Sequence, residues 1–173
     1  VAKFQIYHTD ALVREVPNRA LLRSCELTGD EHHHVSLHCH ARGIEWMASC
    51  FDYRAVDLAC ELGAKTIKVG SGELVNHNLL RHVAKSGKLL LLSTGMATMD
   101  EVGAATEVFD MACGGNGDDR LSLLHCVSNY PTLPEHCNLR AMKKLRDTLF
   151  CPVGFSDHTM NFDAASNAAC MDA

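Results

Sequence analysis

Polar and charged side chains collect at the carboxyl end of the short β-rich runs of this sequence. The third run carries Lys68 between two β-branched residues and then breaks into a glycine-rich stretch with Ser71 and Glu73. An ammonium group inside an apolar strand is costly to bury unless an anion meets it. Glycines beside the serine let backbone amides approach the same anion. The stretch therefore predicts a phosphate or carboxylate site, with Glu73 as a nearby acid or base.

The other runs end in residues of similar chemistry. They are Lys3 and Gln5 in the first, Ser49 in the second, Ser93 in the fourth, Ser128 and Tyr130 after the fifth, and Ser156, Asp157 and His158 after the sixth. Lysines and hydroxyls suit an anion, and a histidine adds a base or a metal ligand. Any single serine could be an ordinary polar residue of a loop. Agreement among six strand ends favours a shared site.

The elements that position these residues alternate between two patterns. The β-rich runs are Val1–Tyr7, Ile44–Phe51, Thr66–Gly70, Lys88–Ser93, Leu121–Val127 and Pro152–Phe155. Amphipathic helical segments are expected at about 30–42, 52–63, 75–86, 98–113 and 138–149, with another starting at Asn161. The stretch from His8 to Leu27 is expected to be a loop.

Strands that are apolar on both faces and alternate with helices predict an α/β fold with a covered parallel sheet. Two architectures fit this pattern: part of an eight-fold barrel, or an open doubly wound sheet. In a barrel, all strand ends of one polarity lie on one face, where active sites are built. Composition alone does not decide between the two.

The bulk properties exclude several classes of protein. The 173 residues suit one domain, and 47% hydrophobic residues are enough to build a core. A net charge of -5 argues against a nucleic-acid partner, and no apolar run reaches the ~20 residues of a membrane span. Nine cysteines without a Cys-x-x-Cys pair indicate reduced, buried thiols and a cytoplasmic protein.

Several other features have simpler interpretations. His34 and His38 are four residues apart in EHHHVSLHCH, but a solvated helix face with Cys39 turned inward is preferred to a metal site. Trp46 is expected in the core, and Met96 and Met99 are expected to pack the start of a helix. His125 and Cys126 are neighbours on a strand, so they point to opposite faces and cannot form a catalytic pair.

Long motifs in a fixed order resemble one known family. KVGSGEL, LLSTGMATMDE, LLHCVSNYPT followed by NLRAM, and PVGFSDHT are similar to stretches of the sialic acid synthases, as are VAKFQ and GIEWMASCFD. The family includes N-acetylneuraminate synthase and relatives that make legionaminate, pseudaminate and spore-coat sugars. The resemblance implies a (β/α)8 TIM barrel, of which this chain would hold about strands 2 to 7.

The resemblance also implies an activity. Family members condense phosphoenolpyruvate with an N-acyl hexosamine, typically N-acetylmannosamine, to give a nine-carbon 2-keto sugar acid and phosphate. A divalent metal, Mn²⁺ or Mg²⁺, polarises the sugar aldehyde. The alternatives are a legionaminate or pseudaminate type of synthase that uses a 6-deoxy diamino sugar, and a non-catalytic truncated fragment.

Site residues carried over from the family fall into four groups. Lys3 and Lys68 would pair with phosphoenolpyruvate, and Gln5 would lie near its carboxylate or the sugar. The hydroxyls expected to bind substrate are Ser49, Ser71, Ser93, Ser128 and Ser156. Glu73 would handle a proton or orient a metal-bound water, and Tyr130 would contact the sugar. In the Ser-Asp-His-Thr motif, Asp157 would bind substrate and His158 would be a metal ligand.

The chain departs from the family pattern at both ends. The first strand, with its Glu and Asn-His motif, would precede Val1, and the eighth strand, with the second metal histidine, would follow Ala173. The family's C-terminal antifreeze-like domain is likewise expected to be missing from this chain, so the chain is expected to be an incomplete barrel with an incomplete metal site and little activity. A full-length version is expected to be a homodimer.

Overall fold

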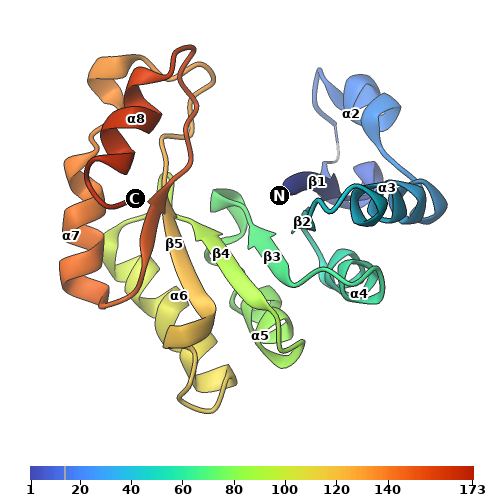
Figure 1. The fold of residues 1–173 in the computed structure, drawn as a ribbon, viewed down its shortest axis with the longest axis horizontal. Helices are drawn as coiled ribbons and strands as arrows, with labels where there is room; N and C mark the ends of the chain where they lie inside the picture. The colour runs from blue at the N-terminus through green and yellow to red at the C-terminus, as the bar shows by residue number, and fades with distance from the viewer. Residues whose placement is uncertain (14) are drawn as a thin grey trace. The chain divides into compact units, whose positions relative to one another are not determined.

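The computed structural model describes residues 1–13 and 15–173, with only the backbone given for Asp118. Its six strands pair in parallel and alternate with helices, which confirms the predicted α/β, partial TIM-barrel fold (Figure 1). The chain forms two compact units, Val1–Lys68 and Val69–Ala173, which we call the N-terminal and C-terminal units. Strands neighbour one another in chain order within each unit, without the reversal of a doubly wound sheet.

The N-terminal unit is built on three parallel strands. They are β1 (Ala2–Ile6), β2 (Trp46–Cys50) and the first part of β3 (Thr66–Val69), and its helices are α1 (Thr9–Leu12), α2 (Arg19–Cys25), α3 (Gly29–Ala41) and α4 (Tyr53–Glu61). In the register, Gln5 lies opposite Ser49, and Ser49 lies opposite Lys68. Every residue of β2 is buried, which confirms that Trp46 belongs to the core.

The expectation of a loop from His8 to Leu27 is wrong for most of that stretch, because α1 and α2 lie in it; residue 14 lies outside the described residues. The two helices are short and α2 has no buried residue, so neither leaves an apolar period in the sequence. Glu26 ties the segment down by accepting bonds from the Thr9 backbone N–H and hydroxyl at 2.9 and 2.6 Å. These bonds, with one from His8, lower the pKa of Glu26 to about 2.

Helix α3 carries the histidine-rich stretch. His34 and His38 are exposed and Cys39 is buried, which confirms the solvated-face interpretation. The surprise is His32, which is 1% exposed and has no hydrogen-bond partner for either ring nitrogen among the described residues. Burial lowers the pKa of its imidazole, because desolvation disfavours the charged ring.

The C-terminal unit is built on β4 (Leu89–Ser93), β5 (Leu121–His125) and β6 (Val153–Phe155). Its helices are α5 (His77–Lys85), α6 (Met99–Ala112), α7 (Arg140–Leu149) and α8 (Asp163–Ala169), with 3-10 turns η1 (Ser71–Glu73), η2 (Asp118–Arg120) and η3 (Pro134–His136). All five predicted helical segments and the segment after Asn161 are therefore confirmed as helices.

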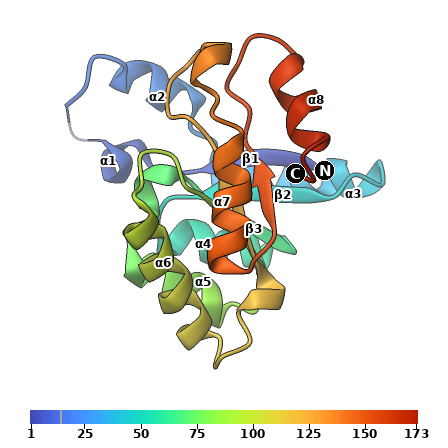
Figure 2. The same cartoon turned by 90° about the vertical axis from the view of Figure 1, so that its left-hand side faces the viewer.

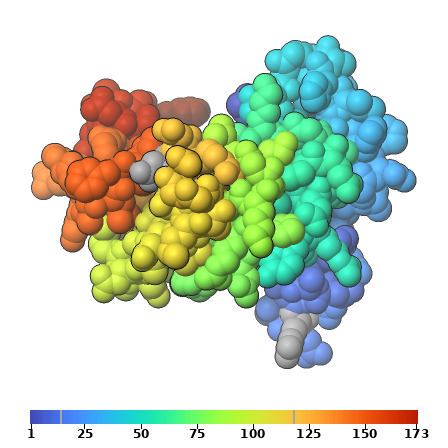
Figure 3. Space-filling view, turned by 90° about the horizontal axis from the view of Figure 1, so that it is seen from below, coloured from blue at the N-terminus to red at the C-terminus, as the bar shows by residue number. Residues whose placement is uncertain are grey.

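Side chains of the strands and helices form the core of this unit. The fully buried side chains of the strands and helices include Leu90, Leu92, Leu123, Phe109 and Met142. Arg120 donates hydrogen bonds to the backbone carbonyls of Ala84 and Lys88, both at 2.9 Å, and so links η2 to the connection between α5 and β4. The connection that follows α6 begins with three exposed residues, Gly114, Gly115 and Asn116 (in the yellow part of Figure 3).

The loops that carry the predicted chemistry lie at one end of the C-terminal unit. The segments that follow β5 and β6 run at the same end as α8, while α7 packs along β6 (Figure 2). Because parallel strands deliver their carboxyl ends to one edge, this arrangement brings the polar loop residues of the unit together. Within the described residues, no helix combines the length and apolarity needed to cross a membrane.

Candidate functional site

In the N-terminal unit, four predicted residues project from one face of three strands. Gln5, Ser49 and Lys68 form a row across β1, β2 and β3, because they are direct partners in the parallel register. Lys3 is two residues before Gln5 on β1 and therefore shares that face. Its ammonium donates to the Ser49 hydroxyl at 3.4 Å. The row combines two cations with a hydroxyl and an amide, a set of donors suited to an anion.

Exposure differs along this row. Ser49 is buried, Lys3 and Gln5 are exposed, and Lys68 is half-buried. Ile67, the residue before Lys68, is fully buried on the opposite face of β3. The strand alternation therefore accounts for a lysine between two apolar residues: its neighbours face the helices, and Lys68 faces the other side of the sheet.

In the C-terminal unit, two predicted serines meet around Gly95. The Ser71 hydroxyl accepts the backbone N–H of Gly95 at 3.0 Å and lies 3.2 Å from the Cys126 sulfur. A Cβ atom at Gly95 would lie 2.4 Å from Ser128 Oγ and 3.0 Å from both Ser71 Oγ and Cys126 Sγ. A side chain larger than that of glycine would therefore be crowded at this position. The sequence contains no sign that Cys126 would join the cluster.

Ser93 is a buried hydroxyl at the end of β4. It is 1% exposed, and its Oγ has no hydrogen-bond partner among the residues that the structure describes. It lies opposite Leu124 in the register. Burying a hydroxyl without a hydrogen-bond partner costs free energy, because the group loses its bonds to water. A ligand that bonds to Ser93 Oγ would recover that free energy.

Tyr130, Ser156 and His158 also meet. The Tyr130 hydroxyl lies 2.9 Å from His158 Nε2, and the two rings stack with centroids 4.0 Å apart. Ser156 Oγ lies 3.5 Å from the same nitrogen. On the other side of the ring, His158 Nδ1–H donates to the Val127 carbonyl at 2.6 Å. Desolvation raises the pKa of Tyr130, so the phenol is protonated at neutral pH.

The two predicted carboxylates have local partners instead. Glu73 Oε2 accepts from the Asn76 amide at 2.8 Å and is half-buried at the end of η1. Asp157 Oδ1 accepts the Thr159 backbone N–H at 2.8 Å, which shapes the turn after β6. The partners in these two hydrogen bonds are local residues and not other predicted site residues.

Two expectations about neighbouring residues have opposite outcomes. His125 and Cys126 do face opposite sides, because His125 Nε2 lies 2.8 Å from the Cys137 carbonyl while Cys126 contacts Ser71. The expectation that Met96 packs the start of a helix is wrong. Met96 is 79% exposed and has a φ of 66°, so the turn before α6 points its side chain into solvent.

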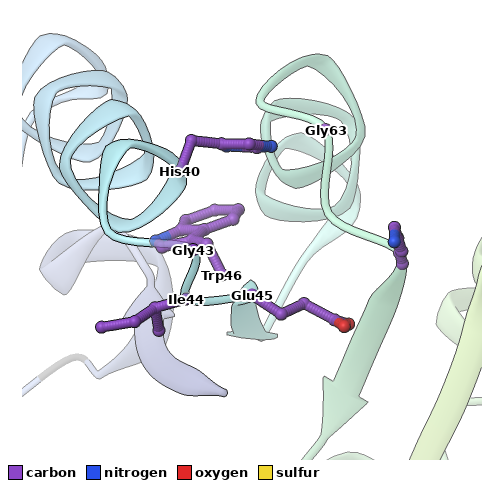
Figure 4. Close-up of a pocket in the computed structure, with 7 residues that line it drawn as sticks. His40, Gly43, Ile44, Glu45, Trp46 and Gly63 are labelled. Carbon is purple, nitrogen blue, oxygen red and sulfur yellow. The ribbon is translucent and has the colours of Figure 1, made fainter.

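A hollow in the N-terminal unit lies away from these residues. Figure 4 shows His40 reaching over Trp46 toward the turn at Gly63, with Glu45 below them. These residues precede or begin β2 and β3, so the hollow lies at the amino ends of the strands. The predicted chemistry belongs to the carboxyl ends, and the hollow is set apart from it.

Among the described residues, no three His, Cys, Asp or Glu side chains gather in a group able to hold a metal ion. The donor chemistry still suits one bond to a metal. Because Nδ1–H donates to the Val127 carbonyl, the neutral His158 ring carries its lone pair on Nε2, the nitrogen that faces Tyr130 and Ser156. His158 could therefore supply one metal ligand.

Comparisons with known proteins agree on one family. A model of the NeuB family matches residues 1–173. The N,N'-diacetyllegionaminic acid synthase of Legionella pneumophila is 36% identical, covering 91% of this chain and 49% of its own length. The N-acetylneuraminate-9-phosphate synthase of Drosophila melanogaster is 34% identical over 78% of this chain and 36% of its own. The chain thus spans about half or less of these relatives.

A solved structure extends the match to three dimensions. The N-acetylneuraminic acid synthetase of Leptospira borgpetersenii, crystallised with citrate, superimposes with a TM-score of 0.92 at 28% identity. The match covers 99% of this chain and 59% of that one.

Proposed function

Because this chain belongs to the NeuB family, we propose that it is part of a synthase that condenses phosphoenolpyruvate with an N-acyl hexosamine. The product would be a nine-carbon 2-keto sugar acid, released with phosphate. The observation that carries the proposal is the row of Gln5, Ser49 and Lys68, with Lys3 on the same face. Two ammonium groups beside a hydroxyl suit the phosphate and carboxylate of phosphoenolpyruvate.

The remaining site residues have proposed roles in the same reaction. The hydroxyls of Ser71, Ser93, Ser128 and Ser156 would bind phosphoenolpyruvate, and Tyr130 would contact the sugar. Glu73 would transfer a proton at the reacting carbons. Asp157 would bind substrate through Oδ2, the carboxylate oxygen that does not accept the Thr159 backbone N–H. The buried Ser93 hydroxyl, which has no partner among the described residues, supports a ligand at this end of β4.

A divalent metal, Mn²⁺ or Mg²⁺, is part of the proposal, with His158 as a ligand. When bound, it would act as a Lewis acid on the sugar aldehyde. The lone pair on His158 Nε2 supports this role. Its remaining ligands would come from the rest of the whole protein, which we propose to be a cytoplasmic homodimer.

The proposal leaves two types of sugar substrate to be distinguished. The similarity to the Legionella synthase favours a 6-deoxy diamino sugar of the legionaminate type, and the Drosophila relative favours an N-acetylmannosamine type. Phosphate release from phosphoenolpyruvate by the whole protein, assayed with each sugar, distinguishes them. Release with neither sugar would favour a chain that binds anions without catalysis.

Lys68→Ala tests the anion site directly. Titration calorimetry with phosphoenolpyruvate should show at least about a tenfold loss of affinity, because a charge-assisted bond contributes roughly 1.5–3 kcal/mol. Lys65→Ala is the matched control, since Lys65 lies just before β3 and lines the hollow at the opposite end of the strands. Equal affinities of the two variants and the parent chain would contradict the anion site.

A further inference from the structure

The contact between Tyr130 and His158 involves the one ring nitrogen that a metal would need. The Val127 carbonyl has no proton to give, so the 2.6 Å bond requires a proton on His158 Nδ1. In the neutral ring this leaves Nε2 with a lone pair and no hydrogen. The Tyr130 hydroxyl, 2.9 Å away, must then be the donor to Nε2.

We propose that Tyr130 caps Nε2 of His158 and must swing off this nitrogen before a metal ion can bind there. The inference rests on the proposed function for the identity of the metal ligand. One lone pair serves either a hydrogen bond or a metal, and not both. Tyr130 is therefore a positioning residue, which controls when Nε2 of His158 is free to bind a metal.

The geometry makes the cap easy to open. Tyr130 is 75% exposed, so few packing contacts hold the phenol over the imidazole. The rings stack at an interplanar angle of 28°, so the phenol lies over one face of the imidazole and is not enclosed with it. The bond to Val127, on the opposite nitrogen, holds the imidazole in place while the phenol moves.

Opening the cap has a consequence for the sugar. A phenol that is bonded to His158 cannot give the same proton to a sugar oxygen. Once a metal takes Nε2, the hydroxyl becomes available for the contact with sugar proposed above. The cap therefore predicts that metal binds before sugar.

Acylation by diethyl pyrocarbonate tests the cap without any metal, because the reagent attacks an unprotonated imidazole nitrogen. Peptide mass spectrometry gives the rate at each histidine at pH 7.5. Tyr130→Phe should raise the rate at His158 about fivefold, the effect expected from loss of one neutral hydrogen bond. Tyr53→Phe, a change at another exposed tyrosine, should leave that rate unchanged, and exposed His34 serves as an internal reference in every sample.

A second measurement uses Mn²⁺ alone and follows the broadening of the His158 ring signals by NMR. The concentration for half-broadening should fall several-fold in Tyr130→Phe, because the metal no longer displaces a hydrogen bond. An unchanged acylation rate at His158 would overturn the cap and leave the proposed function standing. Faster acylation without Mn²⁺ broadening in either protein would support the cap and contradict the metal assignment.

Discussion

The two units hold their site residues by different means. In the N-terminal unit, Lys3, Gln5, Ser49 and Lys68 are strand residues, and the register of the strands alone places them on one face. In the C-terminal unit, the groups around Gly95 and His158 lie in turns, and individual bonds to backbone atoms hold them. A site built on strands depends on the register, whereas a site built on turns depends on each local contact.

This difference predicts that a small change in a turn will have a large effect. Gly95→Ala places a methyl group against Ser71, Cys126 and Ser128 at once, and the sulfur is buried. We expect a loss of about 1–3 kcal/mol in the stability of the C-terminal unit, the usual effect of overpacking. Hydrogen exchange of β4 and β5 peptides in increasing urea measures it.

Gly72→Ala is the control, because Gly72 is also in a turn after a strand, but a Cβ there meets nothing within 4 Å. It should change the stability by less than about 0.5 kcal/mol, as surface changes commonly do. Similar effects of the two substitutions would show that the Gly95 cluster does not constrain the turn.

The same difference explains what the sequence could predict. The six strands and the main helices follow from apolar periodicity, and the face of Lys68 follows from alternation along β3. The contacts in the turns could not be foreseen. The bond from His158 to the Val127 carbonyl joins residues 31 positions apart, and the sequence contains no sign of a backbone acceptor. The exposure of Met96 was missed for a related reason, since a φ of 66° leaves no periodic pattern.

Two buried histidines extend the comparison to pH. His32 in the N-terminal unit has no partner among the described residues, whereas His125 in the C-terminal unit has the Cys137 carbonyl at 2.8 Å. Burial lowers the pKa of folded His32 below its ordinary 6.5, so the unfolded chain binds the proton more readily. Stability of the N-terminal unit should be full above pH 6.5 and fall below it, by at most about 1.4 kcal/mol per pH unit.

Fluorescence of Trp46, the single tryptophan, follows unfolding of the N-terminal unit in urea between pH 7.5 and 5.5. His32→Leu should flatten this dependence, and His33→Leu, at an exposed neighbour, should not. If the slope survives in His32→Leu, another group carries the acid sensitivity. If the stability measured by hydrogen exchange in β5 fell with pH at the same slope, the two units would not differ in acid sensitivity.

The smallest predicted effect concerns a feature that the units share. Helices α3 and α6 begin with the same capping box, in which Thr28 or Thr98 pairs with a glutamate three residues on. In both boxes the glutamate accepts the threonine N–H at 2.7 Å, and the threonine hydroxyl accepts at 3.3 Å. Thr28→Ala and Thr98→Ala should therefore each cost about 1 kcal/mol of stability in their own unit.

Trp46 fluorescence reports the first variant, and hydrogen exchange of α6 reports the second. Thr→Ser at each position is the control, because it keeps the capping oxygen and should restore most of the stability. Equal losses would mean that local capping acts independently of how each unit holds its site. A much larger loss at Thr98 would mean that the start of α6 supports the neighbouring turn at Gly95, so that the C-terminal unit depends on its helix ends as well as on its loop contacts.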